Sequence, residues 1–170
     1  MCNAKEHGLS RRQFGFFGLS ALGLSASPQK AVAAEIEALA LTCIDHRLVD
    51  DGVRFFDNLH LTNEYDQVAL AGASLAGVSP KFPSSNAAVW DHVAIAKQLH
   101  HISKVIVLDH RDCGAYKVAF GKDFAAAHDA ETAQHKKVML QFQATLKQKY
   151  PDLGSEFYLM ALNGTAERVV

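Results

Sequence analysis

The 170-residue sequence lacks any excess of charge, since 17 lysine and arginine residues face 18 aspartate and glutamate residues. The net charge of -1 gives no electrostatic reason to expect a nucleic acid or an anionic membrane as a partner. The sequence also has no internal repeat and no low-complexity tract. Its hydrophobic content of 49% and charged content of 21% are typical of one globular domain with a sizeable core.

An apolar run long enough to cross a membrane is lacking as well. The uncharged stretch over residues 14–26 is shorter than the roughly 20 helical residues that span a bilayer. It follows Arg11-Arg12, in a context that resembles the twin-arginine export signature, and it precedes the small-x-small pattern Ala31-Val32-Ala33. We therefore predict a signal peptide over residues 1–33 and a mature domain over residues 34–170. The protein is then periplasmic or otherwise exported and meets the membrane only during export, the alternative being an ordinary amphipathic N-terminal helix.

Cysteine is scarce: three are present, and Cys2 falls within the predicted signal peptide. The other two lie in short polar clusters, Cys-Ile-Asp-His-Arg from Cys43 and His-Arg-Asp-Cys ending at Cys113, and each cluster follows an apolar run. Two thiolates and the imidazole of His110 form a soft donor set that suits tetrahedral Zn²⁺. Three protein ligands leave a fourth position for water, as in catalytic zinc sites. The sequence thus predicts a zinc site at Cys43, His110 and Cys113.

A disulfide between Cys43 and Cys113 is the main alternative, because an exported chain meets an oxidising compartment. Each cysteine taken alone could also be a small core residue. A disulfide, however, gives no reason for His110, Asp45 and Arg47 to gather beside it. The combination of residues favours the metal site.

Four short apolar runs predict strands that are buried on both faces, at residues 36–43, 67–71, 104–108 and 157–162. Helical spacing of apolar residues appears over 89–99 and over 135–146, where the second helix stops at Tyr150 before a proline. Residues 72–85 indicate a long loop, and Gly121 a break. This order predicts an α/β domain with a mainly parallel central sheet and flanking helices. Both clusters then lie at carboxyl ends of strands, where such sheets bind ligands.

Cys-x-Asp-x-Arg after one strand and His-x-x-Cys-Gly after a later one resemble the β-class carbonic anhydrase family, and the order of elements is similar over most of residues 36–170. The resemblance implies that Cys43, His110 and Cys113 hold zinc and that Asp45 and Arg47 form a catalytic dyad beside it. Asp45 then accepts a hydrogen bond from zinc-bound water, or becomes a fourth ligand in a resting state, and Arg47 holds it away from the metal. A homodimer or higher homo-oligomer is implied too.

The expected function is that of a zinc lyase in which zinc-bound hydroxide reversibly converts carbon dioxide to bicarbonate. The sequence departs from the family where Leu48-Val49 replace a usual proline and where Ala69–Ser74 replaces an Arg-Asn-Ala-Gly type of stretch. These departures bear on the substrate rather than on the metal. Hydrolysis of carbonyl sulfide or carbon disulfide is therefore one alternative, and a catalytically silent zinc-binding protein of the same fold is another.

Several polar residues near the clusters have two interpretations. His46 could carry protons out of the site, but a solvent-facing side chain is the simpler expectation. Either Asp109 or Asp112 could orient the ring of His110 or the loop backbone, and simple solvation explains them equally well. No role is predicted for His135.

Overall fold

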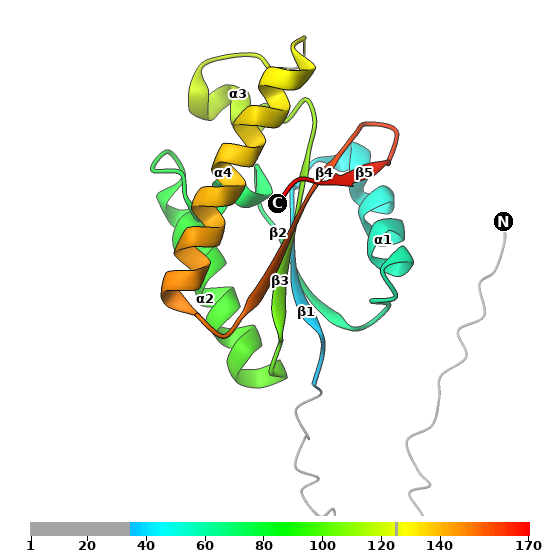
Figure 1. Cartoon of the computed structure of the whole chain (residues 1–170), viewed down its shortest axis with the longest axis vertical. Coiled ribbons are helices and arrows are strands. Elements are labelled where there is room, and N and C mark those ends of the chain that lie inside the picture. Colours follow the sequence, from blue (N-terminus) through cyan, green and yellow to red (C-terminus); the bar gives the residue numbers. More distant parts are fainter. Residues whose placement is uncertain (1–34, 125) are drawn as a thin grey trace, which may run out of the picture. The chain divides into compact units, whose positions relative to one another are not determined.

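The computed structural model describes residues 35–124 and 126–170 (Figure 1). The predicted signal peptide over residues 1–33 lies outside the described residues, so export stays a prediction. The described part contains a five-stranded sheet in the order β2-β1-β3-β4-β5. Its strands are β1 (Ala38–Thr42), β2 (Tyr65–Ala69), β3 (Lys104–His110), β4 (Gly154–Met160) and β5 (Ala166–Arg168).

The first four strands pair in parallel, and only β5 runs antiparallel, beside β4. This arrangement confirms the predicted mainly parallel α/β sheet. Thr42 at the end of β1 pairs with Ala69 on β2 and Leu108 on β3. The carboxyl ends of three strands therefore meet at one edge of the sheet, which is the edge where the two polar clusters begin.

Helices cover both faces of the sheet (Figure 1). They are α1 (Val49–Asn58), α2 (Pro83–His100), α3 (Gly114–Phe120) and α4 (His128–Lys149), with short 3-10 turns η1 (His46–Leu48) and η2 (Ala73–Gly77). Side chains of α2 and α4 pack against one face, and α1 packs against the other. No helix in the described ranges is both long enough and apolar enough to cross a membrane.

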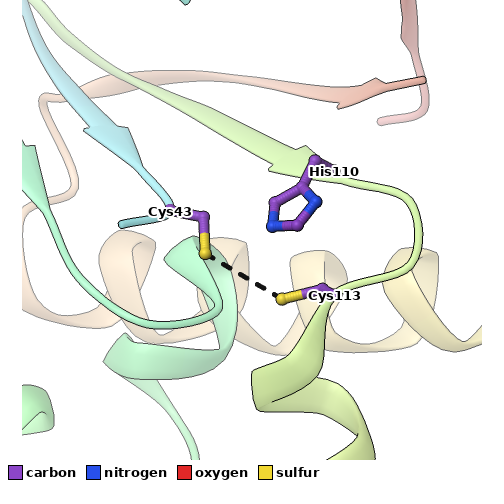
Figure 2. Close-up of side chains that lie close together, drawn as sticks. All are labelled: Cys43, His110 and Cys113. Atoms are coloured by element: carbon purple, nitrogen blue, oxygen red, sulfur yellow. Dashed lines mark hydrogen bonds between the residues drawn. The ribbon is translucent and has the colours of Figure 1, made fainter. Parts of the chain in front are cut away.

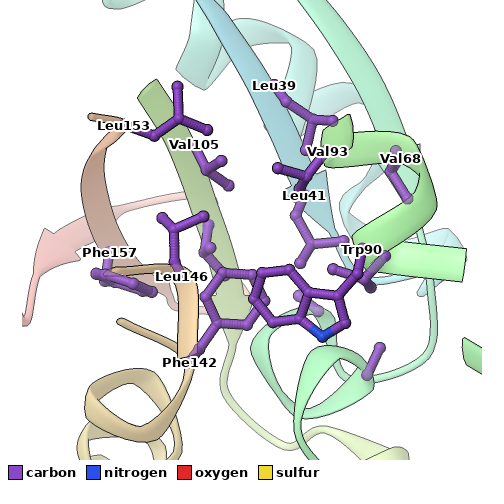
Figure 3. Close-up of a cluster of buried hydrophobic side chains, with 14 of the residues drawn as sticks. Leu39, Leu41, Val68, Trp90, Val93, Val105, Phe142, Leu146, Leu153 and Phe157 are labelled. Carbon is purple, nitrogen blue, oxygen red and sulfur yellow. The ribbon is translucent and has the colours of Figure 1, made fainter. Parts of the chain in front are cut away.

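The core follows from the alternation of side chains along each strand. Leu39 and Leu41 of β1 pack toward α2 and α4, whereas Ala38 and Ala40 pack toward α1. On the α2 and α4 side, the rings of Trp90 and Phe142 stack with centroids 4.9 Å apart (Figure 3). Burying an aromatic side chain such as Phe142 contributes about 1.5–3 kcal/mol. This layer is the larger of the two core layers.

The structure corrects several details of the predicted elements. Residues 72–85 are not a long loop, because η2 and the first turn of α2 lie within them; Pro83, at the start of α2, suits the first helical turn. Strand β2 begins and ends two residues earlier than predicted, and β4 begins three residues earlier and ends two earlier. Helices α1 and α3 and strand β5 were not predicted. Strand β5 has only three residues and no apolar run.

Candidate metal centre

Three soft donor residues converge at the carboxyl edge of the sheet (Figure 2). Cys43 follows β1, His110 is the last residue of β3, and Cys113 directly precedes α3. One donor atom from each residue lies within 4.8 Å of the others. The two Sγ atoms are 3.9 Å apart, and both thiols are free in the described part of the chain. This geometry agrees with a metal site and not with the disulfide alternative.

The imidazole of His110 has one ring nitrogen fixed and the other available. Its Nδ1 lies 2.8 Å from the backbone carbonyl oxygen of Arg111, which can only accept, so Nδ1 donates. Its Nε2 is buried and has no hydrogen-bond partner among the described residues. A buried polar atom without a partner is rare in a native fold. Beside two sulfur atoms, this free Nε2 acceptor fits a metal such as Zn²⁺.

The close contact of the two thiols shifts their pKa values in opposite directions. The hydrogen bond with Cys113 lowers the pKa of Cys43 to about 4, and a bond from the backbone N–H of Gly72 acts in the same direction. The same contact raises the pKa of Cys113 well above its ordinary value. Burial opposes the charged form of His110, but the neighbouring Cys43 outweighs it and raises the pKa of His110. A metal ion must displace these protons, so its affinity falls as the pH falls.

Asp45 and Arg47 lie directly beside the three donors. The Arg47 side chain donates through Nε to Oδ1 of Asp45 at 2.9 Å and through Nη2 to Oδ2 at 2.8 Å. These bonds hold the pKa of Asp45 well below its usual range. Oδ2 of Asp45 is 3.7 Å from Nε2 of His110. The structure thus brings the predicted dyad to the candidate metal centre, whereas the side chain of His46 is 93% exposed.

Asp112 forms a second anchor for the Arg47 guanidinium. Arg47 Nη1 donates to Oδ2 of Asp112 at 3.0 Å, and Nη2 reaches its backbone oxygen at 3.2 Å. The other carboxylate oxygen of Asp112 accepts from Lys117 Nζ at 2.8 Å. Lys117 and Arg47 together lower the pKa of Asp112. Asp112 is therefore neither the partner of the His110 ring nor merely solvated.

Asp109 is the centre of a buried hydrogen-bond network behind the donors. Its carboxylate accepts from the backbone N–H and the hydroxyl of Ser74, at 2.9 and 2.6 Å. It also accepts from the hydroxyl of Tyr116 and from Nδ1 of His135, both at 2.8 Å. Burial and the charge of Asp109 raise the pKa of Tyr116 well above its usual value, so the phenol stays a donor. Sequence reasoning missed this network, and its one local signal was a charged residue directly after an apolar run.

The loop between His110 and Cys113 is tied to α4 and β5. Arg111 pairs with Glu131 at 3.2 Å and with Glu167 at 2.6 Å. The buried Glu131 also accepts from the backbone N–H of Asp112, at 2.6 Å. These contacts fix the path of the loop that carries two of the three donors.

Solved structures of carbonic anhydrases share this fold. A carbonic anhydrase from Streptococcus mutans matches with a TM-score of 0.55 and 18% identity, over 82% of this chain and 84% of that chain. The β-carbonic anhydrase CcaA matches with a TM-score of 0.51 and 11% identity, over 79% of this chain and 74% of that chain. At these identities the likeness shows a β-carbonic-anhydrase-like fold.

Sequence relatives and a family model extend this result. Uncharacterized proteins of Rickettsia conorii and Rickettsia bellii are each 34% identical over 135 residues, which is 79% of this chain and 73% and 82% of theirs. The model of the family described as "Putative carbonic anhydrase" matches residues 33–150. The chain belongs to this carbonic anhydrase family, as a divergent member of the β class.

Proposed function

We propose that the protein is a zinc-dependent carbonic anhydrase-like lyase that reversibly hydrates carbon dioxide to bicarbonate. The observation that carries the proposal is the convergence of Cys43, His110 and Cys113, within 4.8 Å, beside the paired Asp45 and Arg47. Two thiolates and one imidazole suit Zn²⁺ and leave a coordination position open. The free Nε2 of His110 supports the same assignment.

The residues around the donors have separate tasks in this proposal. A zinc ion, when bound, supplies the Lewis acidity that brings the ionisation of water to about pH 7. Asp45 is kept ionised by Arg47, so it accepts a hydrogen bond from water at the site and orients it. The two bonds from Arg47 fix the direction of that carboxylate and hold it back from the fourth position. Leu108 and Met160, which line the adjacent cavity, offer an apolar surface to a neutral gas.

One second function is favoured by a specific observation. The cavity beside the donors has a largely apolar lining that includes Ala69, in the stretch that departs from the usual family sequence. Such a lining suits carbonyl sulfide or carbon disulfide as well as carbon dioxide. Hydrolysis of one of these molecules is therefore the alternative reaction for the same site.

The decisive experiment measures zinc content and gas turnover on the same protein. Zinc-loaded wild type should hydrate carbon dioxide, and Asp45→Asn should keep its zinc but lose about a hundredfold of the rate, a typical acid-base contribution. Asp50→Asn, an exposed carboxylate on α1, is the matched control and should keep the wild-type rate. Turnover of carbonyl sulfide or carbon disulfide without turnover of carbon dioxide would show that the substrate is the sulfur-containing molecule. No turnover of any of the three gases by the zinc-loaded protein would identify a silent zinc-binding protein.

Export through the twin-arginine pathway is proposed from the sequence. Replacing Arg11 and Arg12 with lysine should retain the precursor in the cytoplasm, and the exported form should begin at or near Ala34. Fractionation followed by N-terminal sequencing checks both. Unchanged export of the double-lysine variant contradicts the proposal.

A homodimer or higher homo-oligomer is proposed as the working state. Large apolar side chains are exposed next to the metal centre, with Ile44 61% and Val118 70% exposed. Covering such residues across a two-fold axis is a common reason for assembly. Light scattering of the zinc-loaded protein checks the state, and a monomer at every concentration overturns it.

A further inference from the structure

A cavity of about 260 Å³ adjoins the candidate metal centre on the α1 face of the sheet. Leu48 and Gly52 line it from the α1 side, and Ala69, Leu108 and Met160 line it from three strands. Asp45 and His110 also belong to its lining, so the cavity is continuous with the place where the donors converge. Its volume is just below the roughly 300–1,000 Å³ of pockets that hold drug-sized ligands. A triatomic gas leaves most of this space unfilled.

Gly52 keeps part of this space open. It lies in the middle of α1 and is buried, yet a Cβ atom added there would have no described neighbour within 4 Å. Glycine disfavours a helix interior, and alanine would suit α1 better. A helix position that is buried but next to empty space is what a ligand pocket requires.

The charges around the cavity select the kind of ligand. Among the described residues that line it there is no lysine or arginine. The guanidinium of Arg47 is already engaged by Asp45 and Asp112, and it balances the charge of Asp45. The carboxylate of Asp109 is turned away into its own hydrogen-bond network. Apart from the metal ion of the proposed function, an anionic ligand would find no free cation along this wall, whereas a neutral arm meets a mostly apolar surface.

We propose that this cavity binds a neutral molecule with an apolar arm of several carbon atoms, whose polar end faces Asp45 and His110. The inference deepens the proposed function, because it names a larger class of molecule that the same site can hold as substrate or competitor. It rests on the proposed function only for the zinc ion at the polar end. The arm lies among Leu108, Met160 and the surface left free by Gly52.

Primary alcohols from methanol to hexanol are suitable probes, because they combine a small neutral head with an arm of adjustable length. In zinc-loaded full-length protein with labelled methionine methyl groups, the NMR signal of Met160 should shift saturably as alcohol is added. Met139, which is fully buried in the core layer on the opposite face, should not respond and is the internal control. Each added methylene should tighten binding about fourfold until the cavity is full.

Two variants of α1 test the location of the arm. Gly52→Leu fills the cavity and should weaken butanol binding at least tenfold. Val53→Leu adds bulk at the next residue, which is 44% exposed and does not line the cavity, and should bind as wild type does. Gly52→Ala, which adds one methyl group, should give an intermediate loss and keeps the test valid if the leucine variant does not fold.

The inference would be overturned by no saturable shift of Met160, by equal shifts of Met160 and Met139, or by unchanged binding in folded Gly52→Leu. A Met160 signal that depends on protein concentration but not on alcohol would show a second copy of the chain as the occupant, and would overturn it too. Hydration of carbon dioxide is measured separately. Loss of that activity with the Met160 shift intact would refute the proposed function alone.

Discussion

The two sides of the candidate metal centre are built in opposite ways. Behind the donors, the carboxylate of Asp109 is buried, with a side chain only 1% exposed, and accepts bonds from three residues. On the α1 side, Asp45 is 17% exposed and borders a cavity of about 260 Å³. The dense side packs behind the three donor residues, and the open side leaves unfilled space beside them. The packed side and the open side of the site are formed by different residues, so a substitution can change one side without changing the other.

The largest effect is expected from removing a donor at the junction of the two sides. Zinc-loaded wild type should hold about one zinc per chain, and Cys43→Ser, His110→Ala or Cys113→Ser should each lose most of it, since three ligands leave little redundancy. His92→Ala, an exposed histidine on α2, is the control and should keep its zinc. Elemental analysis after dialysis measures the content. Full retention by any of the three donor variants contradicts the metal assignment.

The pH dependence of metal binding follows from the same donors. The pKa of Cys113 is raised in the metal-free chain, so its proton must leave when the metal binds. Zinc affinity should therefore increase with pH across the neutral range and decrease as the medium becomes acidic. Competition with a chelator at several pH values gives the slope, and an affinity independent of pH would show that Cys113 is not a ligand.

The next effect concerns the dense side alone. Asp109→Ala removes the acceptor shared by Ser74, Tyr116 and His135, and should lower the free energy of unfolding by about 3–5 kcal/mol. Asp91→Ala, at an exposed position on α2, should change it by less than about 0.5 kcal/mol. Urea unfolding of both variants and the wild type gives the comparison. A loss below about 1 kcal/mol for Asp109→Ala would mean that the network contributes little to stability.

Most of the sheet and the three donors could be predicted because their signals are local. Short apolar runs indicate buried strands, and a polar cluster directly after such a run indicates the carboxyl end of a strand. The Asp109 network has no local signal beyond the charge of Asp109 itself, because Ser74 and His135 are 35 and 26 residues away in sequence and meet Asp109 only through the crossovers. The cavity beside Gly52 depends in the same way on how α1 lies over the sheet. Local sequence pattern therefore predicts the three donor residues better than it predicts their surroundings.

A smaller effect is expected at the contact between Arg47 and Asp112, which links the two sides. Both side chains are partly exposed, at 37% and 29%, so solvent weakens the pair. Asp112→Asn should lower turnover by at most about fivefold, as expected for an ion pair worth about 0.2–1 kcal/mol. Cobalt-substituted protein provides a second readout, since release of Asp45 toward the metal would alter the visible spectrum. Asp129→Asn, a fully exposed control on α4, should change neither the turnover nor the visible spectrum.

The sign of the pH effect at Asp112 follows from its lowered pKa. A carboxyl group whose pKa is lower in the folded chain stabilises the fold at pH values above its pKa in the unfolded chain. This contribution is lost as the pH falls through the pKa of the folded chain. The difference in the free energy of unfolding between wild type and Asp112→Asn should thus be present at neutral pH and disappear in acid. A difference that grows in acid would contradict the assigned ion pair.

The smallest net change is expected at Gly52, and it is compared with Gly77 on the packed side, where alanine should change the free energy of unfolding in the opposite direction. Gly52→Ala, next to the cavity, should raise the free energy of unfolding by up to about 1 kcal/mol, because alanine favours the helix and its methyl group meets nothing. Gly77→Ala, on the packed side, should lower it by about 1–3 kcal/mol, because its Cβ would collide with the ring of Phe142. Thermal and urea unfolding of the metal-loaded proteins measure both. Destabilisation by Gly52→Ala would show that the space beside α1 is filled in solution. The α1 side would then be as densely packed as the opposite side, and the proposed ligand pocket would not exist.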